Sequence, residues 1–148
     1  MVNLPPPIWT LIYLLVAAGL SALAGWPRAP GLPIVWLGVV LVILGIALSV
    51  TAAGLFRRVG TELNPTSPAN AKLVTSGPFR LTRNPMYLSL VIASLGIAIW
   101  IGAWPMFLAP IATFATANWV HIPFEEAKMR RQYGEAYDAY TQRVRRWL

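Results

Sequence analysis

The sequence of 148 residues contains no cysteine and a single histidine, His121. Without thiols the chain has no disulfide framework, no thiolate metal ligands and no cysteine nucleophile. No cluster of metal-ligating side chains surrounds the histidine in the sequence, so a metal site has no support. These absences exclude disulfide-stabilised folds and cysteine chemistry, and we expect no bound metal.

Charged residues are also scarce, at 11%, whereas about a quarter of the residues in a soluble domain are charged. Hydrophobic residues make up 57%, and the mean hydropathy is +0.58. Four apolar stretches have roughly the length needed to cross a hydrocarbon core of ~30 Å. They cover residues 8–26, 32–56, 86–103 and 106–124. We therefore predict an all-α integral membrane protein with one domain over 1–148, four transmembrane helices, and the lipid bilayer as its surroundings.

The first apolar stretch could be mistaken for a secretory signal. It has no basic segment before it, and Trp26-Pro27 is a poor site for signal cleavage. We expect this stretch to remain as the first helix.

Basic residues gather in two places, between the second and third apolar stretches and after the fourth. Lysine and arginine are enriched on the cytoplasmic side of membrane proteins. We therefore place the loop over 57–85, the tail over 124–148 and both termini on the cytoplasmic side of a multi-pass protein in the cell inner membrane. The net charge of +7 then sets orientation and attracts anionic headgroups; we expect no nucleic acid, because the chain has no soluble nucleic-acid-binding module.

The most informative polar segment is LVTSGPFRLTRNPMYL, over residues 73–88. Two prolines, a glycine, two arginines and an asparagine make it a stiff turn rich in hydrogen-bond donors, and Asn84-Pro85 is typical of a helix start. Mere connection of two helices needs only a few polar residues. We interpret the segment as a ligand-binding loop at the start of the third helix.

Two of the five acidic residues, Glu125 and Glu126, are adjacent where the fourth apolar stretch ends. One interpretation is a pair of salt bridges to Lys128 or Arg130. The other is that a carboxylate faces a cationic or hydroxyl-bearing ligand held between the loop and the tail. His121 lies one helical turn before Glu125 and is either structural or a partner of that carboxylate.

The tail over 124–148 has apolar residues at steps of three and four, which predicts an amphipathic helix. Its apolar stripe is rich in tyrosine, and it either lies on the membrane or closes a cytoplasmic pocket over the loop. Asn118, at or near membrane depth, is either a contact between helices or a pocket residue. The stripe consists of Met129, Tyr133, Ala136, Tyr137, Tyr140, Val144 and Trp147.

Taken together, these motifs resemble the isoprenylcysteine carboxyl methyltransferase and phospholipid methyltransferase superfamily. The resemblance covers residues 72–148 and is carried by Gly77-Pro78-Phe79-Arg80-x-Thr82-Arg83-Asn84-Pro85-Met86-Tyr87, then Glu125-Glu126, then Tyr133-Gly134-x-x-Tyr137-x-x-Tyr140. It implies an integral membrane enzyme that uses S-adenosyl-L-methionine to methylate a small or lipid-like acceptor through a carboxylate, amine or thiol.

In that superfamily the Arg-His/Asn-Pro-x-Tyr segment and the Glu-Glu pair line the cofactor site, and the tail helps to enclose it. Many members have histidine where this chain has Asn84, which removes a titrating group. The resemblance implies cofactor-binding roles for Val74, Gly77, Arg83, Asn84, Pro85, Tyr87, Glu125 and Glu126, with the two glutamates also as catalytic candidates.

The chemistry of the methyl donor agrees with this assignment. Its carboxylate needs donors, which Arg83 and loop N–H groups can supply, and its hydroxyls and ammonium need acceptors, which Glu125 or Glu126 can supply. A hydrophobic acceptor would enter from the bilayer. Two other interpretations stay open: a non-catalytic membrane subunit or binding protein, and a nicotinamide-dependent reductase on a scaffold similar to membrane sterol reductases.

Overall fold

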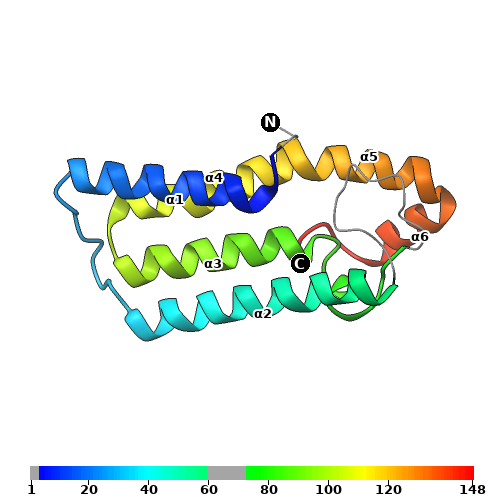
Figure 1. Cartoon of the computed structure of the whole chain (residues 1–148), viewed down its shortest axis with the longest axis horizontal. Helices are drawn as coiled ribbons and strands as arrows, with labels where there is room; N and C mark the ends of the chain where they lie inside the picture. Colours follow the sequence, from blue (N-terminus) through cyan, green and yellow to red (C-terminus); the bar gives the residue numbers. More distant parts are fainter. Residues whose placement is uncertain (1–3, 60–72) are drawn as a thin grey trace.

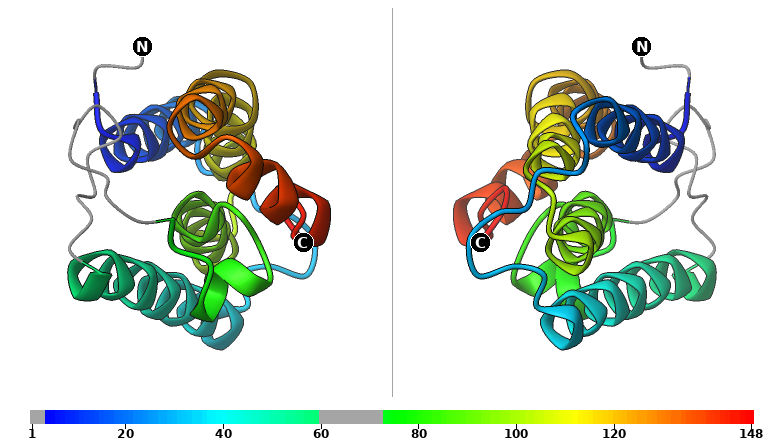
Figure 2. Two further views of the ribbon diagram at one scale, coloured as in Figure 1. Left: turned by 90° about the vertical axis from the view of Figure 1, so that its right-hand side faces the viewer. Right: turned by 90° about the vertical axis from the view of Figure 1, so that its left-hand side faces the viewer.

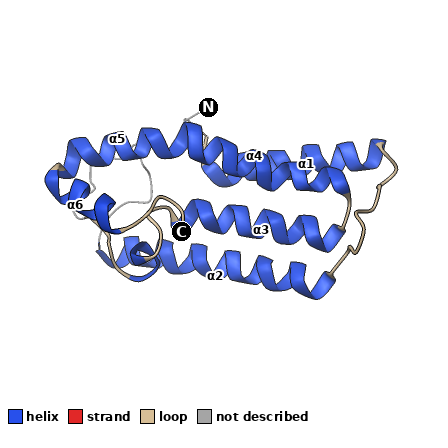
Figure 3. Ribbon diagram, turned by 180° about the vertical axis from the view of Figure 1, so that it is seen from behind, coloured by secondary structure: helices blue, strands red, loops and turns tan. Residues whose placement is uncertain are grey.

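The computed structural model describes residues 4–59 and 73–148. The predicted loop over 57–85 therefore falls partly outside the described residues. Over the part of the chain that is described, the regular structure is helical and no strand is present, which confirms the all-α prediction (Figure 3). The long helices are α1 (Pro6–Leu23), α2 (Val35–Val59) and α3 (Pro85–Ile101), followed by α4 (Leu108–Thr116), α5 (Ile122–Tyr133) and α6 (Glu135–Arg143).

The bundle is built around α3. This helix packs along α2 on one side and against α4 on the other, while α1 packs on α4. In Figure 1 the α1 and α4 pair and helix α2 lie on opposite sides of α3, and the end-on views of Figure 2 show α3 between them. Residues 73–84 of the loop lie with α5 and α6 at one end of this bundle (Figure 1).

Glycines allow α2 and α3 to approach closely. A Cβ atom on Gly96 would lie 2.7 Å from the Gly38 carbonyl oxygen, and one on Gly45 would lie 2.8 Å from the Ser89 carbonyl oxygen. A Cβ atom this close to a carbonyl oxygen would clash with it, so glycine is required at these crossings. Small residues at helix crossings are typical of membrane bundles, in which close backbone packing replaces the hydrophobic effect.

The outward faces of the helices are apolar. Leu15 and Leu23 on α1 and Trp36 and Val50 on α2 are each more than 60% exposed. So many large apolar side chains exposed on these helices indicate surfaces that are covered by lipid or protein. By length and composition, helices over 6–23 and 35–58 can cross a membrane. Helix α3 has 17 residues, so the third and fourth transmembrane helices stay predictions.

The fourth predicted helix, 106–124, is interrupted. Helix α4 ends at Thr116, a π-helical turn covers Ala117–His121, and α5 continues from Ile122. Pro123 has no N–H and cannot donate to the carbonyl one turn before it, which accounts for a break in the regular ladder at this point.

The sequence predicts a single helix over 124–148, and this prediction is wrong: the tail forms two helices followed by extended chain. Gly134, with a φ of +50°, separates α5 from α6, and the chain becomes extended at Val144. Glycine adopts a positive φ without the steric cost that a Cβ brings. Because of this break, α6 turns back toward the loop and does not continue along α5 (Figure 1).

Candidate functional site

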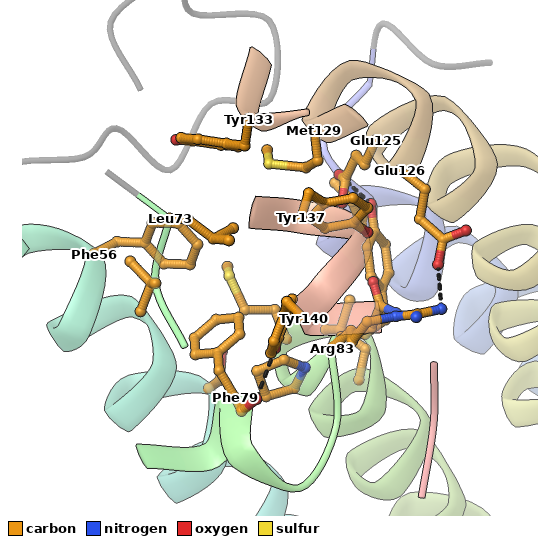
Figure 4. A pocket seen from close by; sticks show the side chains of 18 of the residues that line it. Phe56, Leu73, Phe79, Arg83, Glu125, Glu126, Met129, Tyr133, Tyr137 and Tyr140 are labelled. Atoms are coloured by element: carbon orange, nitrogen blue, oxygen red, sulfur yellow. Dashed lines mark hydrogen bonds and ion pairs between the residues drawn. The ribbon is translucent and has the colours of Figure 1, made fainter. Parts of the chain in front are cut away.

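A partly open cavity of about 180 Å³ lies where the loop, the start of α3, α5 and α6 meet (Figure 4). Seven of the eight predicted site residues line it, and they come from segments about forty residues apart in the sequence. The seven are Val74, Arg83, Asn84, Pro85, Tyr87, Glu125 and Glu126. The fold therefore brings the loop and the glutamate pair together, while their role in binding a cofactor stays a prediction.

Gly77 is the predicted site residue that does not line this cavity. It has a φ of +59°, and a Cβ atom there would lie 2.8 Å from Leu55 Cδ1 of α2. Both observations explain why glycine is needed at this turn. The structure gives Gly77 a backbone and packing role beside α2.

Glu126 is buried and lies between two arginines. Its Oε1 accepts a hydrogen bond of 2.8 Å from Arg83 Nη2, and its Oε2 accepts one of 2.6 Å from Arg146 Nη2. Arg130, which the sequence analysis considered as a glutamate partner, instead pairs with the exposed Asp138 at 3.4 Å. Charge-assisted hydrogen bonds of these lengths hold a carboxylate in one position.

Glu125 has a different environment from its neighbour. It accepts a hydrogen bond of 2.6 Å from the Tyr87 hydroxyl. Burial raises the pKa of Glu125 to about 7, against a lowering effect of the Tyr87 hydrogen bond and of the positive charge of Lys128. The two adjacent carboxylates therefore differ. Glu126 forms ion pairs with two arginines, whereas Glu125 has a pKa near neutral pH.

His121 lies next to Tyr87, and the two rings stack with 5.9 Å between their centroids. The side chain is buried, and its Nε2 has no hydrogen-bond partner among the described residues. The structure therefore places His121 against the tyrosine that binds Glu125.

Arg83 also has a donor without a partner among the described residues. Its Nη1 donates to the Thr141 carbonyl oxygen at 3.2 Å and its Nη2 to Glu126. Its Nε is buried and has no partner within the described part of the chain. Buried polar atoms in proteins are nearly always paired, so this guanidinium donor needs a partner that the described residues do not supply.

The tyrosine-rich stripe forms a wall of the cavity, as the second interpretation of the tail predicts. Tyr133, Tyr137, Tyr140 and Met129 all line it (Figure 4). The Tyr140 hydroxyl donates to the Phe79 carbonyl oxygen at 2.6 Å, and burial raises the pKa of Tyr140 to about 12. This contact joins α6 directly to the loop.

The final residues tie the tail to the loop. The Arg83 N–H donates to the Arg145 carbonyl oxygen at 2.9 Å, and the Asn84 side-chain amide donates to the Arg146 carbonyl oxygen at 2.9 Å. Trp147 Nε1 donates to Asn118 Oδ1 at 3.0 Å. Asn118 is therefore a contact between helix and tail, and Asn84 holds the tail in place.

Sequence reasoning missed several lining residues and one charged partner. Phe79 lies inside the quoted motif, and a large aromatic side chain in a predicted ligand-binding loop could have indicated a pocket wall. Arg146 gave no such signal, because its pairing with Glu126 depends on the reversal of the chain at Gly134. The other lining residues missed are Pro6, Pro7, Ser49, Phe56, Leu73, Met86 and Leu90.

The sequence is similar to several known proteins. The sequence is 32% identical over 126 residues to protein-S-isoprenylcysteine O-methyltransferase B of Arabidopsis thaliana, which covers 78% of this chain and 61% of that protein. It is 31% identical over 118 residues to a probable protein-S-isoprenylcysteine O-methyltransferase of Oryza sativa subsp. indica, covering 74% of this chain and 58% of that protein. An uncharacterized protein of Haemophilus influenzae is 36% identical over 63 residues, which are 43% of this chain and all of that protein.

The chain spans about three fifths of the length of the two plant relatives. A sequence profile described as phospholipid methyltransferase matches residues 33–136, a range that includes the loop and both glutamates. Because this match covers well over half of the chain, the protein belongs to the phospholipid methyltransferase family.

Proposed function

We propose that this protein is an integral membrane enzyme that transfers a methyl group from S-adenosyl-L-methionine to a lipid-like acceptor at the cytoplasmic membrane face. The observation that supports this most strongly is the cavity itself. In a chain of a methyltransferase family, it joins Arg83 and Tyr87 of the loop region to Glu125 and Glu126 of α5.

The residues around the cavity fit the chemical groups of the methyl donor. The unpaired Nε of Arg83 suits the carboxylate, and Glu125 suits the ammonium group or the ribose hydroxyls. The aromatic rings of Phe79, Tyr133 and Tyr137 suit the adenine and the sulfonium cation. The cavity volume of about 180 Å³ is below the ~300–1,000 Å³ of typical ligand pockets. The methyl donor would therefore extend through the open side of the cavity.

The donor, when bound, supplies a methyl group on a positively charged sulfur. The protein's own contribution is to position the reactants and keep water away, because in-line displacement depends on orientation. Glu126, held by two arginines, positions Arg83. Glu125, with a pKa of about 7, can accept the proton of an amine or thiol acceptor near neutral pH, whereas a carboxylate acceptor needs no base.

A lipid-like acceptor suits the rest of the architecture. Residues of α1, α2 and α3 line the cavity with apolar groups, among them Pro7, Phe56 and Leu90. The outward faces of the same helices are apolar. An acceptor with its apolar body in the bilayer can therefore present its polar end at the cavity.

A calorimetric titration of the detergent-solubilised chain with S-adenosylhomocysteine tests the proposal. Tyr87→Ala and Glu126→Gln should weaken binding, and Glu135→Gln should not, because Glu135 is exposed and does not line the cavity. Absence of S-adenosylhomocysteine binding to well-folded protein would refute the proposal. NADPH binding in its place would favour a reductase, and co-purification of a stable partner with no small-molecule binding would favour a non-catalytic subunit.

A further inference from the structure

A cluster of two positive charges and one negative charge is formed by the side chains of Arg83, Arg146 and Glu126. Arg146 contacts both oxygens of Glu126, with Nη2 at 2.6 Å from Oε2 and Nε at 3.2 Å from Oε1. Arg83 Nη2 shares Oε1 at 2.8 Å. Two guanidinium groups and one carboxylate leave a net positive charge beside the cavity.

We propose that Arg146 is a positioning residue for the anionic end of the ligand. By taking up much of the charge of Glu126, it leaves Arg83 available to bind a carboxylate. The inference rests on the proposed function, and it adds a residue that lies outside the family match over 33–136.

The reason is electrostatic. The Arg83 and Glu126 side chains are 12% and 7% exposed, so water screens their charges poorly. Without Arg146 they would form a neutral pair, and an incoming carboxylate would meet the negative charge of Glu126 next to Arg83. With Arg146 present, that repulsion is offset, and the unpaired Nε of Arg83 remains as a donor.

The side chain of Arg146 can be changed without releasing the tail. The backbone carbonyl of Arg146 accepts hydrogen bonds from Thr82 Oγ1 at 3.0 Å and from the Asn84 amide at 2.9 Å. Trp147 keeps its bond to Asn118. These contacts do not depend on the guanidinium group, so the charge and the attachment of the tail can be tested separately.

The test compares two probes on the full chain in detergent: S-adenosylhomocysteine and its decarboxylated analogue, which lacks only the carboxylate. Arg146→Gln should lower affinity for the first roughly tenfold and for the second less than about twofold. Arg145→Gln is the matched control, since Arg145 is exposed and adjacent, and it should change neither affinity. Arg146→Lys keeps the charge, and the ratio of the two affinities should stay near the wild-type ratio.

Several results would overturn the inference. An equal loss for both probes in Arg146→Gln would show a purely structural role, and no loss for either would show no role. If Arg146→Gln does not fold, a ratio in Arg146→Lys that falls by about tenfold counts against the proposal, because charge is retained. Failure of the wild-type chain to bind either probe would instead refute the proposed function, so the two failures are distinguishable.

Discussion

Glu125 makes a quantitative prediction about pH and stability. Burial gives it a pKa of about 7 in the folded protein, compared with the ordinary glutamate pKa of 4.5 that applies to an unfolded chain. The fold therefore favours the neutral carboxyl. The stability that this group contributes is fully present below pH 4.5 and is lost as the pH rises through about 7.

The size of the effect follows from the same two values. At 1.36 kcal/mol for each pKa unit, the difference between about 7 and 4.5 amounts to about 3 kcal/mol above pH 8. Glu125 is partly exposed, so this is an upper value. For a chain of this size it corresponds to a change in Tm of up to about 10 °C.

The assay is thermal unfolding of wild-type and Glu125→Gln protein in detergent, without ligand, from about pH 4 to 8.5. Glutamine can still accept the Tyr87 hydrogen bond but carries no charge, so the variant should be the more stable protein at high pH and gain little at low pH. Taking the difference between the two proteins removes the contribution of His121, which both share.

Two further proteins sharpen this assay. In Tyr87→Phe the hydrogen bond that lowers the Glu125 pKa is lost, so the loss of stability should continue to a higher pH. Glu135→Gln, on the exposed face of α6, should follow the wild-type profile. A pH-independent difference between wild type and Glu125→Gln would refute the reasoning.

Three other predictions concern the fold around the site. Gly96→Ala should destabilise the α2–α3 contact by about 1–3 kcal/mol, because its Cβ would lie 2.7 Å from the Gly38 carbonyl oxygen; Gly19→Ala, with nothing within 4 Å, is the control in thermal unfolding, and equal effects would contradict the packing. Tyr140→Phe should cost about 1–3 kcal/mol in the same assay by leaving the Phe79 carbonyl without its 2.6 Å partner, and an unchanged Tm would argue against that contact. Trp147→Phe removes the donor to Asn118 and should speed hydrogen exchange at the Arg83 amide, which binds the Arg145 carbonyl; unchanged exchange would show that the tail is held elsewhere.

The helical class could be predicted from sequence because it depends on local pattern. The same holds for the choice of the loop and the glutamate pair as the segments of the candidate site. Long apolar runs predict helices, and Asn84-Pro85 predicts the start of α3, which begins at Pro85. The family resemblance, seen first in the motifs of residues 72–148, is confirmed by the profile match over 33–136.

The parts that sequence could not supply depend on contacts between distant residues. The break at Gly134 was hidden because the tyrosine stripe keeps a helical period across it, so one helix was predicted where α5 and α6 form. That break in turn brings Arg146 onto Glu126. The difference between Glu125 and Glu126 arises from burial and from partners on α3, the loop and the tail, none of which the adjacent sequence contains.

The most direct test of the central claim is transfer of a labelled methyl group. Membranes that contain the wild-type chain, given S-adenosyl-L-methionine labelled on the methyl group, should accumulate label in the organic-solvent extract, and membranes with the Tyr87→Ala variant at equal abundance should accumulate much less. Equal label in both membranes, or none above membranes without the chain across lipid extracts of varied composition, would contradict the account of this cavity as a methyltransferase site.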